Sequence, residues 1–184
     1  VTYEINDGLL PSNTLNSTVN VVPVNDRPTL DLDGTTAGTG YATFFNQDTG
    51  NPVPIGDVDV RITDVDDTMI ESATIAITTN RQSADFLTAG TLPAGITASA
   101  YNPATGVLTL TGSATLADYQ AAIRAIGFDT DSTITGTRTI TVTVNDGTAN
   151  SISANTTVSI LGAGNRPVLD LDADDSSGGT STSY

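Results

Sequence analysis

The chain has 184 residues, of which 21 are acidic and only six are basic, so its formal net charge is −15. Such a chain repels nucleic acids and anionic membrane surfaces, and no apolar run approaches the length of a membrane span. The absence of Cys and His excludes disulfides, thiolate metal sites, Cys nucleophiles, and His-based catalysis or metal binding.

The first residues predict a β-hairpin followed by a linker. Residues 1–5 alternate apolar side chains with Thr or Glu, which is typical of a half-buried strand. Asn6, Asp7 and Gly8 form a strong turn signal, and a second alternating run covers residues 15–22. Residues 25–28 then read as a linker, because a proline at position 28 does not fit a central strand.

The middle of the chain predicts an all-β sandwich with one helix. Short strands are expected at residues 29–33, 41–45, 58–62, 70–78, 96–101 and 106–111, with a turn at residues 92–95. Only residues 116–126 have helical spacing, and Thr115 with Asp118 resembles a capping box at their start. Short strands at this spacing with one helical crossover indicate a β-sandwich.

A repeat organises the chain. Residues 140–172 reproduce residues 1–33 without insertion or deletion, at an offset of 139 residues and with 14 identities in 33 positions. Such a fixed spacing is typical of a tandem-repeat array. We therefore interpret residues 25–163 as one complete repeat, hereafter the module. Residues 1–24 are interpreted as the C-terminal hairpin of a preceding repeat, and residues 164–184 as the start of a following one.

The two partial repeats carry apolar side chains that neither of them can bury alone, namely Val1, Tyr3, Ile5, Leu169 and Leu171. An isolated two-stranded hairpin is only marginally stable in water. We therefore expect a continuous fibre or a head-to-tail assembly, in which adjacent repeats of the same chain or of a neighbouring chain cover these side chains. Donation of the missing strands by a neighbouring chain is the alternative.

The strongest chemical signal is the run of Asp64, Asp66 and Asp67, with Glu71 close behind. Asp accounts for 19 of the 21 acidic residues, and its short side chain is typical of turns and of oxygen-ligand cation sites. Two carboxylates about 4 Å apart repel by roughly 4 kcal/mol at an effective dielectric of about 20. We therefore predict a Ca²⁺ site here, with Val65 turned into the core; a solvated acidic turn is the alternative.

A second pattern pairs carboxylates across a leucine. Asp31 and Asp33 flank Leu32, and in the repeat Asp170 and Asp172 flank a leucine in the same way. In an extended strand both carboxylates of a pair lie on one face while the leucine anchors the other. We predict ligand roles for both pairs; a strand edge guarded by charge is the alternative.

Further acidic residues are weaker candidates. Each leucine-flanking pair adjoins a linker, which makes Asn25 and Asp26 additional candidate ligands. The weaker pairs are Asp57 with Asp59 and Asp129 with Asp131, whereas Asn6, Asp7, Asn145 and Asp146 are interpreted as turn residues.

Enzymatic activity is not expected. Paired carboxylates can hydrolyse glycosides, but they need a cleft and a proton donor with a raised pKa. The Asp clusters of this chain read as solvated and mutually repelling, and the nine aromatic residues are few for stacking sugars. The sequence therefore favours binding or structural roles.

Taken together, these motifs resemble the bacterial cadherin-like repeats of giant surface adhesins, including those of the repeats-in-toxin class. The resemblance rests on residues 27–33, 62–67, 92–97, 105–112, 116–120, 138–140 and 145–147, which span nearly all of the module in order. The linker at residues 25–28 is also similar to the Asn-Asp-x-x-Pro linker of cadherins, where inter-domain Ca²⁺ is bound. It departs from that pattern because one residue is missing before Pro28, and Asp26 becomes Asn165 in the second linker.

The resemblance implies a cadherin-like or immunoglobulin-like β-sandwich in an extracellular, cell-surface protein whose repeats are stiffened by Ca²⁺. Two functions follow: a structural extender of an adhesin or surface filament, serving adhesion or biofilm formation, or a recognition module for a surface glycan or protein. We favour the structural function, because the aromatic residues are spaced as core or edge residues rather than clustered as in a ligand pocket: Tyr41, Phe44, Phe45, Tyr101 and Phe128.

Overall fold

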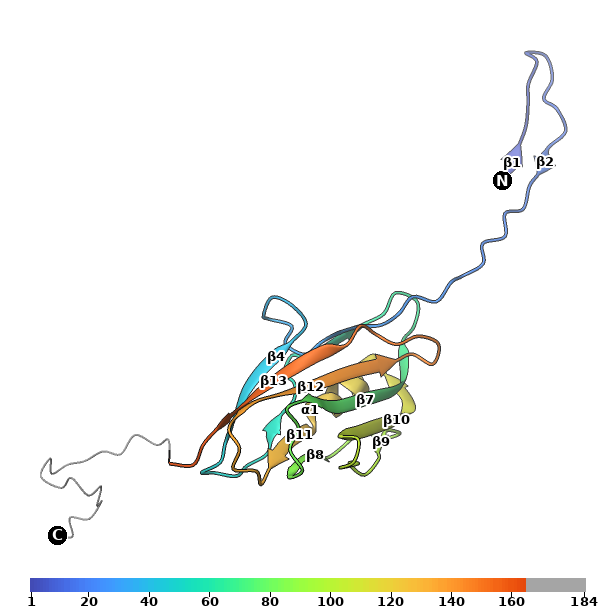
Figure 1. The fold of residues 1–184 in the computed structure, drawn as a ribbon. Coiled ribbons are helices and arrows are strands. Elements are labelled where there is room, and N and C mark those ends of the chain that lie inside the picture. Colours follow the sequence, from blue (N-terminus) through green and yellow to red (C-terminus); the bar gives the residue numbers. More distant parts are fainter. Residues whose placement is uncertain (165–184) are drawn as a thin grey trace, which may run out of the picture.

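The structure is a computed structural model that describes residues 1–164. It consists of a β-sandwich and, standing away from it, a small N-terminal hairpin of β1 (Thr2–Tyr3) and β2 (Leu15–Asn16) (Figure 1). An extended segment joins the hairpin to one end of the sandwich, and the described chain leaves at the opposite end (Figure 1). The chain therefore enters the sandwich at one end and leaves it at the opposite end.

The larger layer of the sandwich is a six-stranded sheet in the order β4-β13-β12-β7-β10-β9. Its strands are β4 (Tyr41–Asn46), β7 (Met69–Thr79), β9 (Thr97–Ala98), β10 (Val107–Thr115), β12 (Gly136–Asn145) and β13 (Ala154–Leu161). Neighbouring strands are antiparallel except for β13 and β4, which are parallel. The closing hairpin, formed by β12 and β13, thus lies between β7 and β4.

The second layer contains two smaller sheets and the helix. Its elements are β3 (Thr29–Asp31), β5 (Val53–Pro54), β6 (Arg61–Thr63), β8 (Asp85–Ala89), β11 (Ile126–Thr130) and α1 (Leu116–Arg124). The strands pair as β5-β11-β8 and as β3-β6. Helix α1 carries the chain from β10 of the large sheet to β11 of the small one (Figure 1). The predicted all-β sandwich with one helical crossover is confirmed.

The core lies between the layers and follows the alternation of the strands. In β7, Ile75 and Ile77 are buried while Thr74 and Thr78 face solvent, and β12 buries every second side chain in the same way. Fully burying one such aliphatic side chain stabilises the fold by roughly 1.5–3 kcal/mol. Phe45 and Phe128 meet edge to face across this core, with ring centroids 5.9 Å apart.

Helix α1 begins where its cap was predicted. The Thr115 hydroxyl accepts a hydrogen bond from the Asp118 amide at 3.1 Å and donates one to the Asp118 carboxylate at 2.7 Å. The helix buries one face through Tyr119 and Ile123, and the Tyr119 hydroxyl donates to a carbonyl of β10. It ends two residues earlier than predicted, because Ile126 is already the first residue of β11.

Some predicted strands differ from the observed ones. The strand expected at residues 58–62 begins only at Arg61, because residues 57–59 turn and leave Val58 84% exposed. Strands β5, β8 and β11 were not predicted. At the N-terminus, the runs at residues 1–5 and 15–22 form strands only at Thr2–Tyr3 and Leu15–Asn16.

Candidate metal centre

Three carboxylates gather on the loop that follows β6. The linker cluster, which we define as Asp64, Asp66 and Asp67, offers one carboxylate oxygen from each residue, and these atoms lie within 4.8 Å of one another. One oxygen of Asp64, Oδ1, accepts hydrogen bonds from the backbone amides of Asp66 and Asp67, both at 3.1 Å. These bonds turn the loop around the Asp64 side chain and hold the three acidic residues together.

The other oxygen of Asp64 makes this cluster suitable for a cation. Asp64 Oδ2 is buried, yet it accepts no hydrogen bond from any of the described residues. A buried carboxylate oxygen without a partner costs about 1–3 kcal/mol or more. A hard cation such as Ca²⁺, which takes six to eight oxygen ligands in a tolerant shell, would satisfy it. The residues present therefore fit the predicted Ca²⁺.

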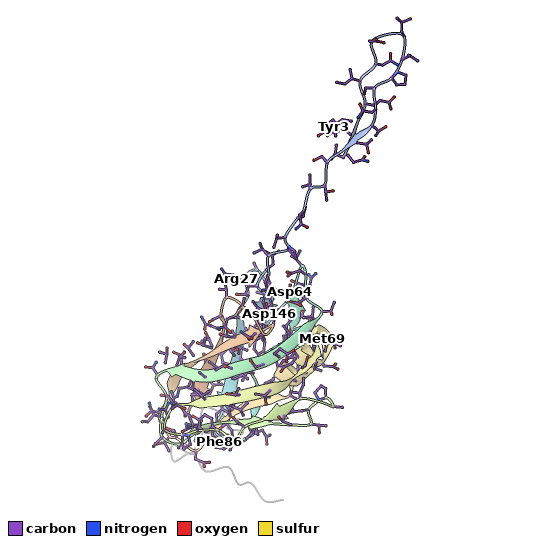
Figure 2. All side chains as sticks on the ribbon, turned by 90° about the vertical axis from the view of Figure 1, so that its right-hand side faces the viewer. Tyr3, Arg27, Asp64, Met69, Phe86 and Asp146 are labelled. Atoms are coloured by element: carbon purple, nitrogen blue, oxygen red, sulfur yellow. The ribbon has the colours of Figure 1, made fainter. Side chains whose placement is uncertain are left out.

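A fourth carboxylate comes from the turn between β12 and β13. Asp146 belongs to the turn residues that the sequence indicated, and its Oδ1 accepts from the Thr148 and Ala149 amides, both at 2.6 Å. The fold also brings it beside the linker cluster, at the end of the sandwich where the linker arrives (Figure 2). Burial raises the pKa of Asp67, and the charges of Asp66, Asp146 and Asp64 raise it further.

The linker itself is tied to these carboxylates. The Asn25 side-chain amide donates to Asp146 Oδ2 at 3.1 Å, and the Asp26 backbone amide lies 3.2 Å from both carboxylate oxygens of Asp66. Burial raises the pKa of Asp146, but hydrogen bonds from the amides of Ala149, Asn25 and Thr148 outweigh it, so this pKa lies below its ordinary value. The predicted ligands Asn25 and Asp26 thus lie next to the cluster.

Two expectations for this loop need revision. Val65 is 87% exposed, so the prediction that it points into the core is wrong. The reason is that the amides of Asp66 and Asp67 fold back onto Asp64, so the backbone does not alternate as an extended strand would. Glu71 lies on β7 and does not belong to the three-residue cluster; its Oε1 accepts from the Ser113 hydroxyl at 2.6 Å.

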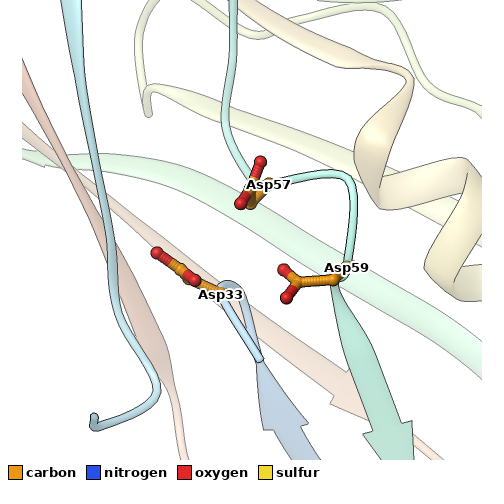
Figure 3. A group of neighbouring side chains, drawn as sticks. All are labelled: Asp33, Asp57 and Asp59. Atoms are coloured by element: carbon orange, nitrogen blue, oxygen red, sulfur yellow. The ribbon is translucent and has the colours of Figure 1, made fainter. Parts of the chain in front are cut away.

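A second group, the loop cluster of Asp33, Asp57 and Asp59, lies near the other end of the β3–β6 ladder (Figure 3). The pKa of Asp33 is lowered, mainly by the Thr36 hydroxyl, which donates at 2.8 Å. The Gly34 amide donates to Asp59 Oδ1 at 3.1 Å, linking the two loops. Two of these carboxylates, Asp57 and Asp59, form one of the pairs that were predicted as weaker candidates.

The predicted pair of Asp31 and Asp33 is divided by the structure. Leu32 between them is fully buried, as expected for an anchor. Asp33 joins the loop cluster, whereas Asp31 lies opposite Arg61 in the β3–β6 ladder and accepts a hydrogen bond from the Asp33 amide. The copy of this pair, Asp170 and Asp172, lies outside the described residues.

Comparisons with protein-family models, with curated proteins and with solved structures gave no match to the chain. Among the described residues, no helix is long and apolar enough to cross a membrane.

Proposed function

We propose that the chain is a Ca²⁺-stiffened structural repeat of an extracellular adhesin or surface filament, in which modules follow one another along a rod. The site at the linker carries this proposal. Three carboxylates gather on one loop at the end of the module where the chain arrives, and Asp146 of a second loop lies close enough to raise the pKa of Asp67. One buried oxygen of this group, Asp64 Oδ2, has no partner in the described residues.

Charge repulsion is the first supporting step. Burial raises the pKa of Asp67, and repulsion from the carboxylates of Asp66, Asp146 and Asp64 raises it further. A divalent cation held by these residues would cancel that repulsion and take up the free Asp64 oxygen. The cluster would then add to the stability of the module instead of reducing it.

The hydrogen bonds of the linker are the second step. Asn25 and Asp26 contact Asp146 and Asp66, so the direction of the linker depends on carboxylates that would hold the ion. Pro28 further limits the linker, because it fixes its own φ and favours an extended Arg27. An ion at this site would therefore stiffen the connection to whatever lies before the module.

The path of the chain is the third step. The linker arrives beside Asp146, while β13 runs away from that turn and ends at Leu161 at the other end of the sandwich (Figure 1). Repeats connected in this way extend end to end. This arrangement suits a spacer that holds another domain away from a surface.

The recognition function has less support. The aromatic side chains Phe45 and Phe128 are buried in the core. An apolar pocket of about 120 Å³ lies beside the linker and is lined by Arg27, Pro28, Thr29, Leu30, Thr39 and Ile152. Pockets that bury small ligands are usually about 300–1,000 Å³, so this pocket is too small to enclose a sugar unit with its neighbours.

The test is thermal unfolding of the whole chain with Ca²⁺ and with a chelator. For a dissociation constant of about 10⁻⁴ M, Ca²⁺ at about 10 mM gives roughly 2.7 kcal/mol per site. That corresponds to an increase in Tm of about 5–11 °C for a domain of this size. Mg²⁺ at the same concentration should raise Tm less, because it prefers a small octahedral site with retained waters.

Matched variants locate the effect. Asp66→Asn should reduce the Ca²⁺-dependent increase, whereas Asp131→Asn, an exposed Asp outside both clusters, should leave it unchanged. Asp59→Asn reports separately on the loop cluster. An identical Tm in Ca²⁺ and in chelator would reject the calcium part of the proposal. Staining of intact, unpermeabilised cells by an antibody against the module tests the surface location.

A further inference from the structure

The N-terminal hairpin has the same strand register as the closing hairpin of the module. Thr2 pairs with Asn16 and Tyr3 with Leu15. At the repeat offset of 139 residues, the module pairs Thr141 with Asn155 and Val142 with Ala154. The isolated bridge between Asn6 and Pro11 likewise corresponds to the bridge between Asn145 and Asn150.

The agreement extends to single hydrogen bonds of the turn. The Asn6 side chain accepts from the Gly8 amide, and Asp7 accepts from the amides of Leu9 and Leu10. The module repeats these bonds with Asn145 and Asp146 as acceptors. In both hairpins a serine hydroxyl accepts from the strand, at 2.9 Å from the Ile5 amide and 3.1 Å from the Val144 amide.

Burial is what differs between the two hairpins. Tyr3 is 57% and Ile5 77% exposed, whereas their counterparts Val142 and Val144 are completely buried. The apolar positions that are exposed here and buried in the module are Val1, Tyr3, Ile5, Val19 and Val21, with counterparts Ile140, Val142, Val144, Val158 and Ile160. The hairpin therefore has the same backbone pairing as two buried strands of the module, but its apolar side chains are not packed against a core.

The hairpin also lacks the neighbouring strands of its counterpart. In the module β12 pairs with β7 and β13 pairs with β4, but among residues 1–164 no further strand pairs with β1 or β2. A two-stranded hairpin needs more strands or a packed face to be stable. The exposed apolar face of the hairpin therefore needs further strands and a packed core to cover it.

We infer that the N-terminal hairpin is the closing strand pair of a second module of the same fold, seated between the strands equivalent to β7 and β4. This inference rests on the array that the proposed function assumes, but not on Ca²⁺. The partner is defined by register: a sandwich with this strand order offers an edge to each strand of the hairpin, as β7 and β4 do for β12 and β13, and an apolar face to both. The hairpin turn points away from the present module, so the second module would continue the rod (Figure 1).

The second module must differ from the first at one place. Tyr3 and Leu15 lie opposite each other, and their counterparts are the smaller residues Val142 and Ala154, which are 0% and 1% exposed. Forcing larger side chains into a packed core is destabilising. The second module therefore has smaller side chains facing Tyr3 and Leu15. Another copy of the described module would bind the hairpin poorly, because its core has no room for these two side chains.

This difference can be tested in the chain as it stands. Val142→Tyr combined with Ala154→Leu installs the hairpin pair in the module and should lower Tm. The matched control, Ile140→Val with Val144→Ile, also installs hairpin residues but keeps the total volume and should leave Tm nearly unchanged. If the Val142→Tyr, Ala154→Leu variant has the same Tm as the wild type, the claim that the two modules differ is overturned.

Docking itself is tested by placing a copy of residues 25–139 before Val1 of the full chain. With Tyr3→Val and Leu15→Ala in the hairpin, backbone amides of residues 2–22 should become protected from hydrogen exchange to the extent expected for the paired strands β12 and β13. Adding Ile5→Asp should abolish the protection, whereas Glu4→Gln should not. Exchange as fast as in the 184-residue chain would overturn the inference.

The same exchange measurement is made with Ca²⁺ and with chelator. Because Asp7 is the counterpart of Asp146, docking would place it beside the linker cluster of the added copy. The added copy therefore carries Asp64→Asn, Asp66→Asn and Asp67→Asn, and the protection should then be equal in both conditions. Equal protection together with an unchanged Tm in Ca²⁺ would reject the calcium function and keep the docking. A Ca²⁺-dependent Tm without protection would do the reverse.

Discussion

Arg138 donates through Nε to Asp85 Oδ2 at 2.9 Å, and both side chains are excluded from solvent. The second oxygen of Asp85 accepts from the Thr130 hydroxyl at 2.6 Å, and Arg138 also donates to the Ile134 carbonyl at 2.9 Å. The pair therefore joins β8 of the small sheet to β12 of the large one. It also holds the loop between β11 and β12 against the sandwich.

Removing one member of this pair should destabilise the module strongly. Asp85→Ala leaves the buried guanidinium of Arg138 without its counter-charge, and breaking such a pair costs about 3–5 kcal/mol. Urea unfolding measures the loss. Asp131→Ala, which removes an exposed carboxylate nearby, should change the free energy of unfolding by no more than about 0.5 kcal/mol. Equal stability of the two variants would show that the pair contributes nothing.

The same pair shows where sequence reasoning about the fold fails. Strand β7 and the closing hairpin could be predicted because their apolar residues alternate without interruption. Strand β8 could not, since Asp85 occupies a buried position where the pattern requires an apolar residue, and its partner Arg138 lies 53 residues away. Strand β11 was missed because Ile126 also fits the helical spacing of α1.

The candidate site was predictable only as far as it is local in sequence. Asp64, Asp66 and Asp67 lie on one loop, so their mutual repulsion can be inferred from spacing alone. Asp146 has the sequence signature of a turn residue, and it is one; only the fold brings that turn to the linker. The exposure of Val65 shows that the alternation of buried and exposed side chains does not extend into this loop, because the Asp66 amide folds back to bind the Asp64 side chain.

Asp146→Asn should weaken both the module and its response to Ca²⁺. The new amide can still accept from the Thr148 and Ala149 amides, but it presents a donor to the donor of Asn25. Losing that bond costs about 1 kcal/mol, and the site loses one charge. Thermal unfolding with and without Ca²⁺ measures both effects. The control is Asp7→Asn, the same turn residue in the exposed hairpin, which should leave Tm unchanged.

The sign of the pH dependence at Asp146 follows from its lowered pKa. A carboxyl group whose pKa is lower in the folded than in the unfolded state stabilises the fold when it is ionised. This stabilisation is complete at pH values above the pKa of the unfolded state, and it is lost as the pH falls through the pKa of the folded state. The stability difference between wild type and Asp146→Asn should therefore be largest near neutral pH and shrink in acid. A difference that grows in acid would contradict the assignment.

Loss of the helix cap should cost less than loss of the ion pair. Thr115→Ala removes the hydroxyl that accepts from the Asp118 amide, and such N-cap substitutions cost about 1 kcal/mol, within a range of about 0.5–2 kcal/mol. Thr115→Ser keeps the hydroxyl and should retain most of that stability. The free energy of unfolding in urea distinguishes the two variants. A Ser variant as unstable as the Ala variant would point to the methyl group of Thr115 rather than to its cap.

The pH dependence at Asp67 should have the opposite sign to that at Asp146. Because the pKa of Asp67 is raised by burial and by neighbouring carboxylates, the folded module binds this proton more tightly than the unfolded chain. Without metal, the associated stability is complete below the ordinary value of 3.8 and is lost as the pH rises through the folded pKa. Asp67→Asn should therefore be more stable than wild type in chelator at neutral pH, and the two should converge in acid.

Calcium should reverse this order, because only the ionised carboxylate of Asp67 is an effective ligand. With Ca²⁺ at neutral pH, wild type should gain more stability than Asp67→Asn, and the gain should shrink on acidification as Asp67 takes up its proton. Melting curves of both proteins, with chelator and with Ca²⁺ across this pH range, test the crossover. The isosteric amide keeps the shape of the loop, so parallel curves for the two proteins in both conditions would show that Asp67 neither repels its neighbours nor binds the ion.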